Sequence, residues 1–204
     1  MTRFERPGRR AVLMAPALLA ACAAESVVAP PGEVSRAVYR HSGPPALTLF
    51  TMISTRSDAG AHSGLMVNGS QRVIFDPAGT FNHPQLPEVN DVFFGITPAA
   101  FDFYVDYHAR ETYRVAVHEI DVSAEQAEIA LQGVRRAGPV APARCNIAIS
   151  DVVGRVPGFE DCPRAWFPRA TMEYFRARPG VRAALYEDDS PDSRGDLIEV
   201  PLVR

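Results

Sequence analysis

The spacing of apolar and polar positions along the chain predicts strands first and mostly helices later, with structure beginning near residue 46. Asn68-Gly69 separates two short apolar runs, and Asn-Gly is the strongest short signal for a β-hairpin. Asp76-Pro77-Ala78-Gly79 then ends the second run as a turn. The predicted strands cover residues 46–53, 62–67, 71–75, 113–122 and 197–203.

Helix signals dominate the middle and the later part of the chain. Thr97-Pro98 offers an N-cap followed by proline in the first turn, and Ser123 with Gln126 forms a capping-box pattern. The predicted helices cover residues 97–107, 123–136, 146–154 and 169–178. We therefore expect one α+β domain over residues 46–204, in which helices flank a small, mostly antiparallel sheet. Residues 187–196 form an acidic loop within it.

The first residues have the pattern of an export signal. Four arginines among the first ten residues precede an apolar run of eleven, Ala11 to Ala21. That run is too short for a transmembrane helix, which needs about 20 residues. It ends in Leu19-Ala20-Ala21-Cys22, which resembles the lipobox of bacterial lipoproteins. The resemblance implies a signal peptide over residues 1–21 and acylation of Cys22, for example with palmitate; an ordinary secretory signal is the alternative.

Residues 22–45 are rich in alanine, proline, serine and glycine and predict a flexible tether between lipid and domain. Beyond residue 21 the chain has 17 basic and 23 acidic side chains, a formal charge of −6, which argues against a nucleic-acid partner. Cys22 acylation would make the lipid bilayer the first partner and place the domain in the periplasm. Ala23 lacks the aspartate that often retains lipoproteins at the inner membrane, so the outer membrane is favoured.

Three residues together suggest nucleophilic catalysis. The hairpin brings His62 near Phe75 or Asp76, because residues whose numbers sum to about 137 face each other across a turn at Asn68-Gly69. A carboxylate beside an imidazole orients the ring and stabilises its charged form. Cys145 opens a predicted helix, whose N-terminal amides and dipole favour a thiolate. Nucleophile, base and orienting group are then all present.

Each of these residues has a structural alternative. His62 is alternatively a hydrogen-bonded strand residue, and Asp76 an ordinary turn former. Cys145 is alternatively a buried apolar residue or bonded to Cys162, which is otherwise structural. Asn82 and His83 follow Asp76 closely and are candidates to line the same cleft. The histidines and cysteines lack the spacing of a zinc site, so we expect no metal and no cofactor.

The segments 47–51, 61–67 and 73–81, with Arg144-Cys145-Asn146-Ile147 later, resemble the circularly permuted papain-like group. This group includes permuted NlpC/P60 amidases and lecithin-retinol-acyltransferase-like proteins, and its histidine strand precedes its cysteine helix. The resemblance covers about half of the chain. It implies a permuted papain-like fold with His62 as base, Cys145 as nucleophile and Asp76 as orienting group. The acyltransferase branch has a second histidine and an asparagine where this chain has Asp76 and Arg144.

These observations predict a membrane-tethered cysteine hydrolase or acyltransferase of the cell envelope. It would act on amide, peptide or ester bonds through a thioester on Cys145. Cell-wall peptides and acylated small molecules are the candidate substrates. The alternative is a non-catalytic envelope lipoprotein that binds or scaffolds on the same fold.

Overall fold

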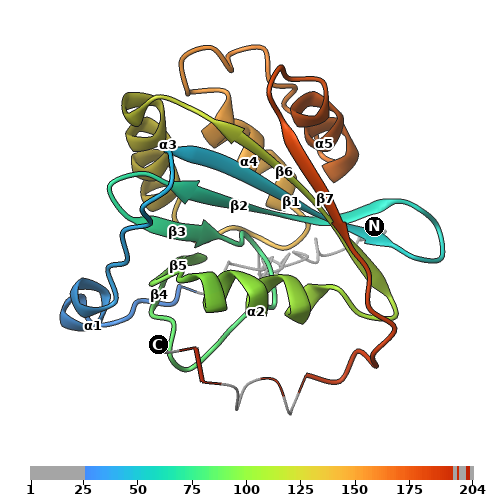
Figure 1. The fold of residues 1–204 in the computed structure, drawn as a ribbon, viewed down its shortest axis with the longest axis horizontal. Coiled ribbons are helices and arrows are strands. Elements are labelled where there is room, and N and C mark those ends of the chain that lie inside the picture. The colour runs from blue at the N-terminus through green and yellow to red at the C-terminus, as the bar shows by residue number, and fades with distance from the viewer. Residues whose placement is uncertain (1–25, 195–196, 198–200, 203–204) are drawn as a thin grey trace, which may run out of the picture.

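A computed structural model describes residues 26–194, 197 and 201–202 and confirms the α+β class (Figure 1). One antiparallel sheet of seven strands has the order β4-β5-β3-β2-β1-β6-β7. The strands are β1 (Ala46–Ser54), β2 (Gly60–Asn68), β3 (Arg72–Phe75), β4 (Glu88–Val89), β5 (Val92–Phe94), β6 (Tyr113–Asp121) and β7 (Arg182–Tyr186). The helices are α1 (Pro31–Arg36), α2 (Pro98–His108), α3 (Ala124–Arg136), α4 (Cys145–Val153) and α5 (Pro168–Arg176).

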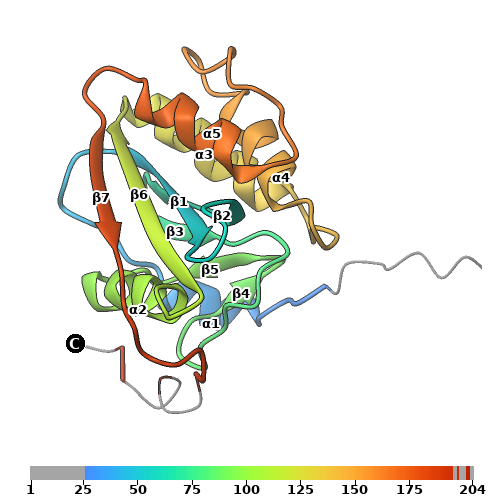
Figure 2. The same cartoon turned by 90° about the vertical axis from the view of Figure 1, so that its right-hand side faces the viewer.

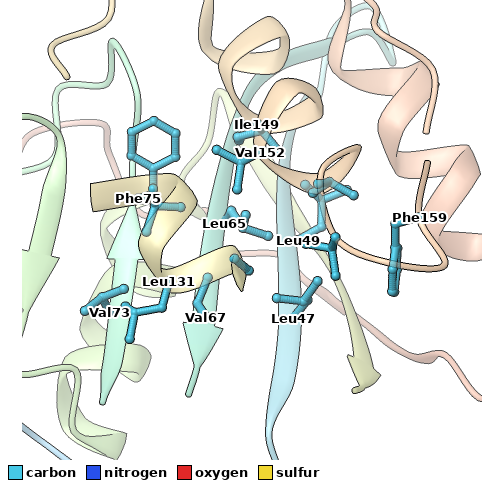
Figure 3. Close-up of a cluster of buried hydrophobic side chains, with 14 of the residues drawn as sticks. Leu47, Leu49, Leu65, Val67, Val73, Phe75, Leu131, Ile149, Val152 and Phe159 are labelled. Atoms are coloured by element: carbon cyan, nitrogen blue, oxygen red, sulfur yellow. The ribbon is translucent and has the colours of Figure 1, made fainter. Parts of the chain in front are cut away.

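Helices cover both faces of this sheet. Figures 1 and 2 show α3, α4 and α5 on one face and α2 on the other. Successive side chains of a strand point to opposite faces, so Leu65 and Val67 pack beneath α3 and α4 (Figure 3), whereas Met66 packs toward α2. Both faces are apolar, which explains why β1 reads as a nearly continuous hydrophobic run.

The helix starts follow the predicted caps. Thr97 accepts a hydrogen bond from the amide of Ala100 at the start of α2, and Ser123 and Gln126 form a complete capping box on α3. Helix α4 begins at Cys145 itself, one residue before the predicted start. None of the helices in the described part of the chain has the length and apolar character needed to cross a membrane.

The register of the β2–β3 hairpin differs from the prediction. Asn68 pairs with Arg72, so three residues form the turn and paired residue numbers sum to 140. The amide of Ser70 in this turn donates to the Glu128 carboxylate of α3 at 2.6 Å. The Asn-Gly signal therefore located the hairpin correctly. The turn is one residue longer than the predicted two-residue turn, and it contacts α3.

Two predicted segments also need correction. Part of the predicted tether, residues 22–45, packs on the domain: Val28 bridges to Val89 in β4, and Val34 of α1 packs against the core. These contacts cover a sheet edge that would otherwise expose unpaired backbone. Most of the predicted strand 197–203 lies outside the described residues, and Leu197 and Leu202 are in no strand. The last strand among the described residues is β7, whose side chains are all exposed and give no alternating burial pattern.

Candidate active site

The candidate site lies where β3 ends and its neighbour β2 continues. The β2–β3 pairing stops at Leu65 and Phe75, while β2 extends back to Gly60 along β1. Residues 60–64 of β2 therefore have no partner strand on that side. Asp76, the first residue beyond β3, and Cys145, the first residue of α4, contact β2 residues there. Residues of β2, of the loop after β3 and of α4 thus meet at one position.

His62, Asp76 and Tyr104 form a hydrogen-bonded group on the α2 side of the sheet. The Nε2 atom of His62 lies 2.7 Å from Oδ1 of Asp76, and the Tyr104 hydroxyl donates to the same oxygen at 2.7 Å. The Asp76 side chain is 1 % exposed and that of His62 is 18 % exposed. His62 is therefore the member of this group that a substrate can approach.

Two glycines provide the space for Asp76. A Cβ atom at Gly64 would lie 2.1 Å from the Tyr104 hydroxyl, and one at Gly79 would lie 1.7 Å from Oδ2 of Asp76. That Oδ2 atom is buried and has no hydrogen-bond partner among the described residues. Neither glycine has a positive φ angle, so close packing around the carboxylate explains their small size, without a turn conformation.

Cys145 completes the group from the opposite face of the sheet. Its thiol is hydrogen-bonded to His62 and also accepts from the backbone amides of Ser63 and Asn146. Because Nε2 of His62 faces Asp76, Nδ1 is the nitrogen left for the sulfur. The sequence prediction of His62, Asp76 and Cys145 as neighbours therefore agrees with the geometry. The Asn146 amide belongs to the first turn of α4, whose amides the sequence predicts to favour a thiolate, whereas the Ser63 amide had no such signal.

The electrostatics of the group favour a thiolate and an imidazolium. Burial lowers the pKa of His62, but the charge and hydrogen bond of Asp76, together with the Cys145 contact, raise it to about 10. Burial raises the pKa of Cys145, but His62 and the two amides bring it below its ordinary value. Burial likewise raises the pKa of Asp76, and His62, His108 and Tyr104 hold it below the ordinary value.

His108 is a second histidine beside the carboxylate. Its Nδ1 lies 2.8 Å from the backbone carbonyl oxygen of Tyr104 in α2, and its ring lies 6.1 Å from that of His62. Burial, as the largest cause, lowers its pKa to about 4, so it is neutral near neutral pH. The position of His108 against Asp76 could not be read from the sequence, because two strands, β4 and β5, separate β3 from α2 along the chain.

Among the described side chains, one group of three is positioned to share a metal ion: His62, Asp76 and His108. His62, Asp76 and His108 each offer one ligand atom within 4.8 Å of the others. The direct contact between His62 and Asp76 at 2.7 Å leaves no room for an ion between them. A bound ion would therefore have to replace the His62–Asp76 hydrogen bond, and the arrangement fits proton transfer better than ligation.

Asn146 fixes the segment that precedes α5. The residue is fully buried; its side-chain amide donates to the carbonyls of Ala165 and Phe167, and its oxygen accepts from the Ser63 hydroxyl at 3.3 Å. The residue after Cys145 therefore connects α4, β2 and the following loop. Its polarity inside an apolar helix was the only sequence signal for this role.

The remaining predicted residues lie elsewhere. His83 is buried against the Phe103 ring, and its Nδ1 accepts from the amide of Gln85. Asn82 is exposed and donates to the Thr80 carbonyl. The contacts described for these two residues involve Thr80, Gln85 and Phe103. Cys22 lies outside the described residues.

Cys162 is a separate, buried thiol. Cys145 and Cys162 are both free, so the structure does not adopt the disulfide that would occupy the nucleophile. Burial raises the pKa of Cys162 to about 11, with a smaller contribution from Asp161. The two cysteines are almost equally buried, at 6 % and 9 % exposure, and differ mainly in the groups that surround their sulfur atoms.

Comparisons with known proteins leave the family open. No family model, curated protein or solved structure matches this chain. The chemistry of the site is therefore argued from its own residues.

Proposed function

We propose that this protein is a cysteine hydrolase or acyltransferase that acts on amide, peptide or ester bonds. The observation that carries the proposal is the hydrogen-bonded series Cys145, His62 and Asp76, which contains a nucleophile, a base and an orienting carboxylate. The resemblance to permuted papain-like proteins agrees with this order along the chain.

Formation of the acyl-enzyme would begin with attack of the Cys145 thiolate on the substrate's carbonyl carbon. The protonated His62 then gives its proton to the departing amine or alcohol, and a thioester on Cys145 remains. Asp76 keeps the imidazole in the required orientation and stabilises its positive charge, with Tyr104 holding the carboxylate.

The second half of the reaction would release the acyl group. His62, now neutral, removes a proton from water or from an acceptor alcohol or amine, which attacks the thioester carbonyl. The backbone amide of Cys145 lies in the first turn of α4, where amides have no intrahelical acceptor, and would stabilise the oxyanion. Water gives hydrolysis and another acceptor gives transfer.

The proposed setting is the cell envelope, with Cys22 acylated and the domain facing the periplasm. Cell-wall peptides and acylated small molecules are the substrate classes available there. Incorporation of labelled palmitate into the wild-type chain, but not into C22S, tests the anchor separately from catalysis.

Thiol labelling tests the activated cysteine. In a C22S chain, iodoacetamide labelling of Cys145 and Cys162 is followed by peptide mass spectrometry as a function of pH. We expect Cys145 to label at least tenfold faster than Cys162 near pH 7, because its lowered pKa supplies more thiolate. Cys162 is the internal control for access.

An H62A variant and a chelator complete the test. H62A should lower the labelling rate of Cys145 near neutral pH and leave that of Cys162 unchanged. EDTA should change neither, because a thiolate held by His62 requires no metal. Equal labelling of both cysteines would instead favour the non-catalytic envelope lipoprotein.

A further inference from the structure

A cavity of about 300 Å³ lies between α3 and α4, next to the start of the nucleophile helix. One side is lined by the end of α3 and the loop that follows it, and the other by a single stripe of α4 and its flanks. The stripe contains Arg144, Ala148, Asp151 and Arg155, which recur at helical spacing. Arg136 of α3 faces them across the cavity.

The charge of this lining is positive. Arg136, Arg144 and Arg155 are exposed and have no carboxylate partner in the described part of the chain, whereas six other arginines do. The one acid of the lining, Asp151, accepts two hydrogen bonds from Arg164, at 2.6 and 3.2 Å, and is thereby neutralised.

The lining of the cavity contains apolar side chains as well as arginines. Val140, Ile147 and Val152 contribute aliphatic side chains. Guanidinium groups bind carboxylates and phosphates with two parallel hydrogen bonds, and a partly apolar wall strengthens them by excluding water. The cavity therefore suits an anionic group attached to an apolar one.

We propose that this cavity binds the anionic group, a phosphate or carboxylate, of the molecule whose carbonyl reacts at Cys145. Arg144 lines the cavity and immediately precedes Cys145, the first residue of α4, and this adjacency is the observation that links the cavity to the nucleophile. This inference rests on the proposed function for its link to catalysis, but anion binding itself does not depend on turnover.

Binding is measured by calorimetry with inorganic phosphate on the full C22S chain. R144A and R155A should each weaken binding about tenfold or more, since each removes charge-assisted hydrogen bonds. R135A is the matched control, because Arg135 is exposed on α3 next to Arg136 but does not line the cavity. Its affinity should equal that of the parent chain.

Vesicle flotation distinguishes the source of the anion. Retention on phosphatidylglycerol vesicles but not on phosphatidylcholine vesicles, reduced by R144A and not by R135A, assigns a lipid headgroup. Phosphate binding without vesicle binding assigns a soluble anion. If neither probe binds, or if R135A weakens binding as much as R144A, the proposed anion site is wrong.

Ester hydrolysis tests the link to the nucleophile. R144A should raise KM for mono-4-nitrophenyl glutarate about tenfold and leave KM for the neutral 4-nitrophenyl acetate unchanged. An equal effect on both esters would refute the substrate-binding role. Phosphate binding without hydrolysis of either ester would refute the proposed enzyme function but not the anion site.

Discussion

Replacing Gly64 by alanine should break the hydrogen bond between Tyr104 and Asp76. The new Cβ would lie 2.1 Å from the Tyr104 hydroxyl and 3.1 Å from its Cζ. The ring cannot simply withdraw, because it is fully buried and packs 4.8 Å from the centres of both Phe50 and Phe81.

Two costs determine the size of the effect. A hydrogen bond to a charged group contributes about 1.5–3 kcal/mol. Overpacking of a filled core costs roughly 1–3 kcal/mol more, and alanine in a strand regains about 0.5 kcal/mol through the unfolded chain. G64A should therefore lower the free energy of unfolding by about 2–5 kcal/mol.

Y104F makes this prediction specific. It removes the hydroxyl, and with it both the hydrogen bond and the closest clash, while keeping the ring. Urea unfolding of the wild type, G64A, Y104F and the double variant gives the coupling free energy. We expect G64A to cost at least about 1.5 kcal/mol less in the Y104F background than in the wild type. Costs that add to within about 0.5 kcal/mol would refute the reasoning.

Three other changes test the remaining parts of the site. D76N should lower the labelling rate of Cys145 near pH 7, because the charge of Asp76 is the largest cause that raises the pKa of His62, to about 10. In the parent chain the protonated His62 stabilises the fold fully below about pH 6.5, and this stabilisation is lost as the pH rises through about 10. In D76N the free energy of unfolding should therefore no longer fall as the pH rises toward 10. N146A should cost roughly 2–4 kcal/mol in urea unfolding and speed proteolysis of the loop before α5, since the fully buried Asn146 side chain is removed and the carbonyls of Ala165 and Phe167 lose their donor; unchanged stability would contradict that bridge. S123A should cost about 1 kcal/mol through loss of the cap, with no change in Cys145 labelling.

Local signals determined much of the fold. Helices α2 and α3 begin where Thr97 and Ser123 cap them, because capping needs only residues within one turn. The order of His62, Asp76 and Cys145 along a hairpin and a later helix was also visible in the sequence. The elements that were missed, α1, β4, β5 and β7, are short or exposed and depend on neighbouring strands or on the core for their contacts.

Only the tertiary structure decided how the site is assembled. The β2–β3 register is offset by three from the expected one, yet His62 reaches Asp76 because both side chains lie on the same face of the sheet as diagonal neighbours. Tyr104 joins them from α2, and Cys145 approaches from the opposite face where β3 ends. Sequence fixes which face a side chain takes within a strand, but contacts between distant elements depend on strand lengths and packing, which no local pattern encodes.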